Sequence, residues 1–249
     1  MSLLQKSKIL LTVAILLGFS AKPSLAATLT YDAANDFSAT NNPNGVWRYG
    51  WESTLGSTFN LYNRTDNSAD LNGLNAWIDP AIAFSRAPAV VHNGTSRPIT
   101  SVNSVTLQPG QLGSHPGQSN QYSIIRWVAP QTGTYSIDTT FSGLDFVGPT
   151  TTDVHVLYNG TSLFNNFING FGPSSAQSFA TSQLIQAGDT VDFAVGFGQN
   201  GNFFQDTTGI SATITGTAVP EPSSSLGILA FGAIGALSAV SRKKSKKAL

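Results

Sequence analysis

The central part of the chain alternates between apolar and polar residues with a period of two, which is typical of strands that bury one face. In segment 134–141, for example, the alternation places Tyr135, Ile137 and Phe141 on one side. No long stretch repeats its apolar residues with a helical period, and turn-forming residues separate the alternating segments. We therefore expect strands at 123–128, 134–141, 153–158, 190–195 and 209–214.

Two Asn-Gly pairs suggest how some strands are joined. Asn159-Gly160 follows segment 153–158, and both residue types tolerate the positive φ that a two-residue hairpin turn requires. The similar segment 92–96 contains a second Asn-Gly pair and predicts a second hairpin of the same kind. Many short strands at this spacing predict an all-β fold, an antiparallel β-sandwich of jelly-roll type. No composition shift divides the region, so we expect one domain over 27–218.

The N-terminal 26 residues have the three parts of a secretory signal peptide. Lys6 and Lys8 precede an apolar run at 9–19, and small residues follow it. We expect the export machinery to carry the chain across the membrane and signal peptidase to cut between Ala26 and Ala27. A lipoprotein signal is excluded because the chain has no cysteine.

The C-terminal end combines an apolar segment with a basic cluster. Segment 226–240 is uncharged and shorter than the roughly 20 residues that cross a bilayer comfortably. By the positive-inside rule, the cluster after it stays cytoplasmic while the body lies outside. Composition alone leaves open whether this is a permanent anchor or a segment that is later removed. The basic residues are Arg242, Lys243, Lys244, Lys246 and Lys247.

The order of features at this end resembles a known sorting signal. Val219, Pro220, Glu221 and Pro222 precede the apolar segment and the basic cluster. This arrangement over 219–249 resembles the PEP-CTERM tail, which the membrane protease-transpeptidase exosortase recognises. The resemblance implies a bacterium with a Gram-negative-type envelope that makes extracellular polysaccharide. It also implies an intermediate anchored in the inner membrane by the apolar helix, followed by processing and placement at the cell surface or outside the cell.

The body resembles carbohydrate-binding-module-like jelly rolls. The resembling stretches include Asp36-Phe37-Ser38 with 42–51, then 151–157 and 187–193. Because these motifs are mainly structural, the resemblance supports the fold more than any ligand.

The charge of the body differs from that of the whole chain. Residues 27–219 hold five arginines, no lysine and twelve acidic residues, which leaves a net charge of −7, whereas the full chain is neutral. An acidic body argues against nucleic acid as a partner. It suits a soluble exterior protein or one that binds cations.

Catalytic signatures are missing from the sequence. Glu52 is the only glutamate before the tail, although glycoside hydrolysis usually needs a pair of carboxylates. There is no G-x-S-x-G elbow and no cysteine nucleophile, and the three histidines lack metalloenzyme spacing. Asp153 and His155 share a strand face, which we expect to be solvated, since two ligands do not make a metal site.

Two groups of residues are candidates for binding. Trp47, Tyr49 and Trp51 alternate on one predicted strand, where they form either a core layer, which we favour, or an exposed platform on which sugars stack. The carboxylates of Asp189, Asp192 and Asp206 offer oxygen ligands for calcium, without the spacing of a known calcium loop. No other cofactor is expected.

The sequence thus predicts a non-enzymatic protein of the cell surface or extracellular matrix. One alternative is a carbohydrate-binding module that recognises exopolysaccharide through the aromatic strip. A second alternative is an extracellular hydrolase with an unrecognised site.

Overall fold

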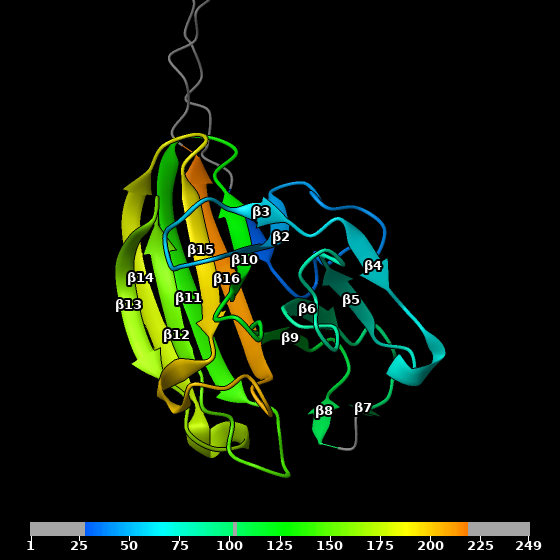
Figure 1. Ribbon diagram of the computed structural model, residues 1–249. Coiled ribbons are helices and arrows are strands. Elements are labelled where there is room, and N and C mark those ends of the chain that lie inside the picture. The colour runs from blue at the N-terminus through cyan, green and yellow to red at the C-terminus, as the bar shows by residue number, and fades with distance from the viewer. Residues whose placement is uncertain (1–27, 102–103, 219–249) are drawn as a thin grey trace, which may run out of the picture.

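The computed structural model describes residues 28–101 and 104–218. Two large antiparallel sheets pack face to face, and a two-stranded ribbon lies beside one of them (Figure 1). This confirms the predicted all-β antiparallel sandwich. The single-domain boundaries at 27 and 218 stay a prediction.

The larger sheet has eight strands, and one edge of its long strand β16 pairs with two different strands. Strand β16 pairs along its whole length with β11, while on its other edge β9 pairs with residues 208–210 and β1 with residues 213–217. In spatial order the strands are β14 (Gln177–Ile185), β11 (Gly133–Gly143), β16 (Thr208–Ala218), β9 (Leu112–His115), β6 (Ala89–His92), β5 (Asn75–Ile78) and β4 (Arg64–Asp66), with β1 (Thr28–Asp32) beside β16.

The second sheet has six strands and carries β15 and β10 at its centre. The separate ribbon β7–β8 lies against the part of the larger sheet formed by β5 and β6 (Figure 1). The six strands are β13 (Thr161–Phe167), β12 (Asp153–Tyr158), β15 (Thr190–Gly196), β10 (Tyr122–Val128), β2 (Trp47–Glu52) and β3 (Asn60–Leu61), and the ribbon comprises β7 (Ile99–Ser101) and β8 (Val105–Leu107).

The helices of the described part are short turns of 3₁₀ type: η1 (Ala69–Leu71), η2 (Gly172–Ser175) and η3 (Gly198–Asn200). Within 28–101 and 104–218, none of them has the length and hydropathy to cross a bilayer. The predicted signal peptide, the cleavage position at Ala26 and Ala27, the Pro-Glu-Pro motif, the apolar segment and the basic cluster all lie outside the described residues.

All five predicted strand segments are strands. In β11 the burial alternates along the strand, and Tyr135, Ile137 and Phe141 are completely buried, as the pattern predicts. The Asn159-Gly160 turn also forms as predicted, with φ of 47° and 76°, and joins β12 to β13. These positive φ angles at both central positions are what the hairpin turn requires.

The second predicted hairpin, at 92–96, is wrong. Strand β6 pairs with β5 and β9, and the chain beyond His92 leaves the sheet. The buried Asn93 side chain explains the difference. Its amide donates to the carbonyls of Arg97 and Leu107, both at 2.9 Å, so it fastens a longer loop.

The expectation of a solvated face at Asp153 and His155 is also wrong. Both side chains are buried, and His155 Nε2 lies 2.8 Å from Asp153 Oδ2. The Tyr122 hydroxyl and the backbone N–H of Gly198 also donate to the Asp153 carboxylate, at 2.7 and 2.8 Å. These hydrogen bonds compensate for removing the carboxylate from water and hold its pKa below the ordinary value, against the effect of burial.

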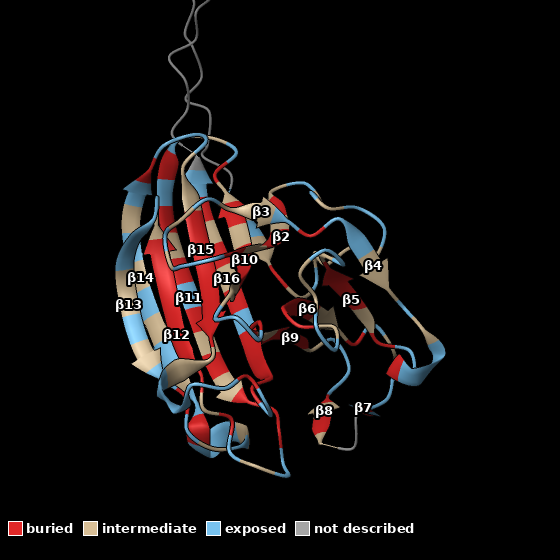
Figure 2. Ribbon diagram, viewed as in Figure 1, coloured by how far each residue is buried: buried red, intermediate tan, exposed pale blue. Residues whose placement is uncertain are grey.

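Buried residues of the two facing sheets, whose strands are largely red in Figure 2, form the main core. A second apolar cluster fills the space between β5, β6 and the β7–β8 ribbon. The second cluster contains Leu71, Leu74, Ala76, Ile78, Ala89, Ile99, Val105, Leu107 and Leu144.

A segment between β2 and β3, residues 53–59, crosses the outer face of the six-stranded sheet (Figure 1). At its middle, a Cβ on Gly56 would lie only 3.3 Å from the carbonyl oxygen of Gly160, which places the segment against the β12–β13 turn. We call residues 53–59 the strap. It covers outward-facing residues of this sheet, among them Glu52 and Arg126.

Candidate functional site

The predicted aromatic strip belongs to the core. Trp47 and Tyr49 are 1% and 0% exposed, and Trp51 is half-buried. The indole N–H of Trp47 donates to Asp36 at 3.0 Å and that of Trp51 to Asp79 at 3.2 Å. A sugar ring cannot reach the aromatic rings of Trp47 and Tyr49, so this strip forms no stacking platform in this structure.

The three predicted calcium ligands do not converge. Asp189 accepts hydrogen bonds from Tyr158 and Asn159, and Asp206 accepts two from Thr151. Over the described ranges, no group of three or more acidic or histidine side chains is arranged to hold a metal ion.

Asp192 belongs instead to a buried ion network under the strap. Arg126 donates to both oxygens of Asp192, at 2.6 and 2.7 Å, and to Glu52 at 3.1 Å. The guanidinium lies 4.1 Å from the ring centre of Phe59, and Glu52 also accepts the backbone N–H of Gly56 at 2.8 Å. Both carboxylates are 1% exposed, and their burial raises the pKa of each. This network fastens the strap and leaves no carboxylate pair open to a substrate.

A second set of buried acids lies under the loops at one end of the sandwich. Asp145 accepts hydrogen bonds from Ser104 and from the backbone of Thr207, at 2.9 and 2.8 Å. Asp206 is 0% exposed, and its Oδ2 atom has no hydrogen-bond partner. Burial raises the pKa of Asp206 to about 6, and the charges of Asp145 and Asp153 add to this effect, although hydrogen bonds from Thr151 oppose it.

Three phenylalanines meet at the surface of this same end. Phe84 and Phe204 are 51% and 65% exposed, and both pack on the buried ring of Phe203, with ring centres 6.1 and 4.6 Å away. We call these three residues the aromatic ledge. His115 meets Phe203 edge to face at 5.9 Å, and burial lowers its pKa, which keeps the imidazole neutral at pH 7.

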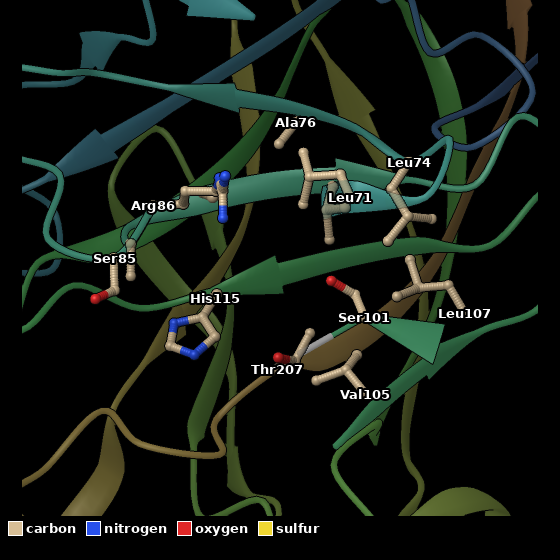
Figure 3. Close-up of a pocket in the computed structure, with 13 residues that line it drawn as sticks. Leu71, Leu74, Ala76, Ser85, Arg86, Ser101, Val105, Leu107, His115 and Thr207 are labelled. Atoms are coloured by element: carbon tan, nitrogen blue, oxygen red, sulfur yellow. The ribbon is translucent and has the colours of Figure 1, made fainter. Parts of the chain in front are cut away.

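A small cavity of about 110 Å³ lies next to the ledge, because its lining includes Ser85, the neighbour of Phe84, and His115, which contacts Phe203. Figure 3 shows the residues that line it. One end is apolar and is lined by leucines of the second cluster, while Ser85, Arg86, His115 and Thr207 stand at the other end. The guanidinium of Arg86 forms an ion pair with Asp66, so its charge is already neutralised by this carboxylate. The volume holds water or one small group and is too small for a cofactor.

Together, the ledge and the cavity offer ring faces and polar groups to which a ligand can bind. The exposed ring faces can stack on the apolar face of another ring, and the neighbouring polar groups can hydrogen-bond to hydroxyls. The sequence did not predict this site, because Phe84 lies in one loop and Phe203-Phe204 in another, with no period to link them. The one signal in the sequence is the Phe203-Phe204 pair after a Gly-rich turn.

The ledge lies at the end of the sandwich opposite the place where the described chain ends. Strand β16 starts at Thr208, next to the ledge, and runs to Ala218 at the other end (Figure 1). At about 3.3 Å per residue, its eleven residues separate the two ends by roughly 35 Å. A chain held at its C-terminal tail would therefore present the ledge away from the point of attachment.

Solved structures with a similar arrangement of strands match this chain with low TM-scores. A CBM51 domain from Clostridium perfringens GH95, in complex with methyl-galactose, has a TM-score of 0.32 and 11% identity, covering 49% of this chain and 81% of that one. A family 35 carbohydrate-binding module from Clostridium thermocellum has a TM-score of 0.27 and 12% identity, covering 58% and 93%. Rabbit GITRL has a TM-score of 0.25 and 14% identity, covering 39% and 74%. At these scores, no ligand is carried over to this chain.

Sequence comparison identifies the tail. No curated protein matches the chain. A family model described as the PEP-CTERM protein-sorting motif matches residues 218–243, which confirms the resemblance seen in the sequence. The match begins at the last residue of β16, so the sorting signal follows directly on the folded body. The chain therefore carries a PEP-CTERM protein-sorting motif behind an antiparallel β-sandwich.

Proposed function

We propose that this chain is an exported, non-enzymatic protein of the cell surface or extracellular matrix, which exosortase processes at its Pro-Glu-Pro motif. The PEP-CTERM match over 218–243 carries the proposal. The signal-like N-terminus supports export, because it would deliver the body outside while the basic tail stays in the cytoplasm.

The chemistry of the body supports a role without catalysis. Within the described ranges, the buried acids with shifted pKa are engaged in ion pairs or hydrogen bonds, or enclosed beneath loops, as Glu52, Asp192 and Asp206 illustrate. The exposed feature at the far end is a set of phenylalanine rings, which bind without donating or accepting protons.

Cell fractionation tests the sorting proposal. In the native host, the body should be found at the surface or in the medium, whereas deletion of the exosortase gene should retain the uncut chain in the inner membrane. A double substitution, Pro220→Ala with Pro222→Ala, should have the same effect in the normal strain, and Ser224→Ala should have none. Equal surface delivery with and without exosortase would sink the proposal.

A second candidate function is binding of a neutral polysaccharide at the aromatic ledge. The specific observation is that Phe84 and Phe204 expose about half or more of their surface beside polar groups at the end distal to the tail. The negative body disfavours an anionic polymer.

Binding to an immobilised neutral exopolysaccharide tests this candidate. In Phe204→Ala, loss of one stacking ring should weaken binding by roughly 0.5–1.5 kcal/mol, the range of aromatic contacts. Val147→Ala is the matched control, since Val147 is 62% exposed and lies outside the ledge. Equal loss in both variants, or none in Phe204→Ala, would rule the ledge out.

A further inference from the structure

Both large sheets end, on the same side of the molecule, in a strand that has only one neighbour. In the eight-stranded sheet this strand is β14, which pairs with β11 through nine residues. In the six-stranded sheet it is β13, which pairs with β12. Within the part of the chain that the structure describes, no strand pairs with the outer edge of either one.

The two free edges lie one over the other (Figure 1). Phe164 of β13 and Phe179 of β14 pack with ring centres 5.2 Å apart, and the side chain of Asn166 donates to that of Gln177 at 2.6 Å. Together they form one surface with two rows of backbone donors and acceptors. We call this surface, formed by β13 and β14, the open edge.

The open edge lacks the features that usually prevent edge-to-edge pairing. Proteins protect edges with charges, prolines, bulges or short strands. Neither β13 nor β14 contains a charged residue or a proline, and only the β12–β13 pair shows a register shift. The opposite edges are protected, because β4 carries Arg64 and Asp66 and β3 has only two residues.

The open edge also exposes apolar side chains. Leu184 of β14 is 62% exposed and Phe167 of β13 is 45% exposed. Exposed apolar groups beside unpaired backbone groups are what a partner strand covers.

We propose that the open edge is a self-association surface, on which β14 of one copy pairs antiparallel with β14 of a second copy. A two-fold axis at Thr181 would set Ser178 opposite Leu184 and Ala180 opposite Ser182, so only neutral side chains face each other. Such self-complementarity is what an isologous contact between identical subunits requires.

The charges of the body lie away from this contact. The nearest is Asp138 on β11, which pairs with Ala180. Its copy would lie three strand spacings away, at roughly 14 Å, beyond the screening length of about 8 Å at physiological salt. The net charge of −7 on each body still repels a second copy at low ionic strength. Added salt should therefore strengthen the association, whereas it would weaken a contact made by ion pairs.

The geometry has a consequence for anchored copies. Antiparallel pairing turns the second copy end over end, so the two C-terminal ends point in opposite directions. Two copies anchored in one membrane cannot pair in this way. If the proposed sorting is correct, the pairing is open to processed copies or to copies on facing surfaces. The association itself does not depend on the sorting.

Sedimentation velocity of the full-length chain, in a non-ionic detergent that solvates the apolar tail, tests the proposal. The wild type should dimerise as its concentration rises, and more strongly with added salt. Ser182→Lys places like charges at the contact and should weaken dimerisation about fivefold or more. Ser211→Lys is the matched control, because Ser211 is exposed on β16, two strands from the edge.

Wild type and Ser211→Lys as dimers with Ser182→Lys as a monomer would support the proposal. A monomer at all concentrations would overturn it, and so would a Ser182→Lys variant that associates like the wild type through its tail or another surface. Thermal melting checks that the variants fold. If Ser182→Lys does not, Ala180→Lys, also at an exposed position of β14, takes its place with the same expected outcomes.

Discussion

Asp206 predicts an unusual pH dependence of stability. The residue is 0% exposed, and its pKa rises from 3.8 to about 6 on folding, chiefly because of burial. Its Oδ1 atom accepts from the backbone and the hydroxyl of Thr151, at 2.9 and 3.1 Å, while Oδ2 is unpartnered. We consider the substitution Asp206→Asn, which keeps the shape and removes the charge.

The sign follows from comparing the folded and unfolded states. Between pH 4 and 6 the folded state binds more protons at this position, so the stability that the proton supplies is lost as the pH rises. Below about pH 4 both states are protonated, and above about pH 6 the full cost of the buried charge is present. At 1.36 kcal/mol per pKa unit, this cost is about 2–3 kcal/mol at pH 7.

Urea unfolding of both proteins from pH 4 to pH 7 measures the effect. The stability of Asp206→Asn relative to wild type should rise by about 2–3 kcal/mol across this range. A difference in stability that is the same at every pH reflects only the hydrogen bonding of the amide. Other groups titrate in both proteins, so their effect cancels in the comparison. A difference in stability that stays flat from pH 4 to 7 would show that Asp206 is ionised normally, and would refute the reasoning.

Two further substitutions test the local structure. Arg126→Ala should destabilise the fold by about 3–5 kcal/mol in urea unfolding, because Glu52 and Asp192 then remain buried without their cation. A loss of stability below about 1 kcal/mol would contradict the buried ion network. Gly160→Ala should lower the free energy of unfolding by about 1–2 kcal/mol, since φ is +76° at this position. Ser162→Ala, at a nearby exposed position, should lower it much less. Equal melting temperatures of the two variants would contradict the turn.

The sequence predicted the central strands because their apolar and polar residues alternate with a period of two. In β11, one face meets the core and the other meets solvent, so the alternation is visible. The edge strands β13 and β14 were not predicted, because each has polar residues on both faces. The outer face of β12 was judged wrongly, since Asp153 is covered by Tyr122 of β10 and by the turn at Gly198, both distant in sequence.

The sequence predicted less of the candidate site than of the fold. The alternation of Trp47 and Tyr49 showed that they share a face, but only the packing of the second sheet decides that this face is buried. The aromatic ledge joins residues about 120 positions apart, Phe84 and Phe204, and no local pattern connects them. The sorting tail, by contrast, is a linear signal and was readable directly.

The most direct test of the central claim, sorting through the PEP-CTERM motif, is the intact mass of the protein recovered from the cell surface. We predict a chain that begins at Ala27 and ends near the Pro-Glu-Pro motif, so that both the apolar segment and the basic cluster are lost. Recovery from the surface of a chain that still ends at Leu249 would contradict it.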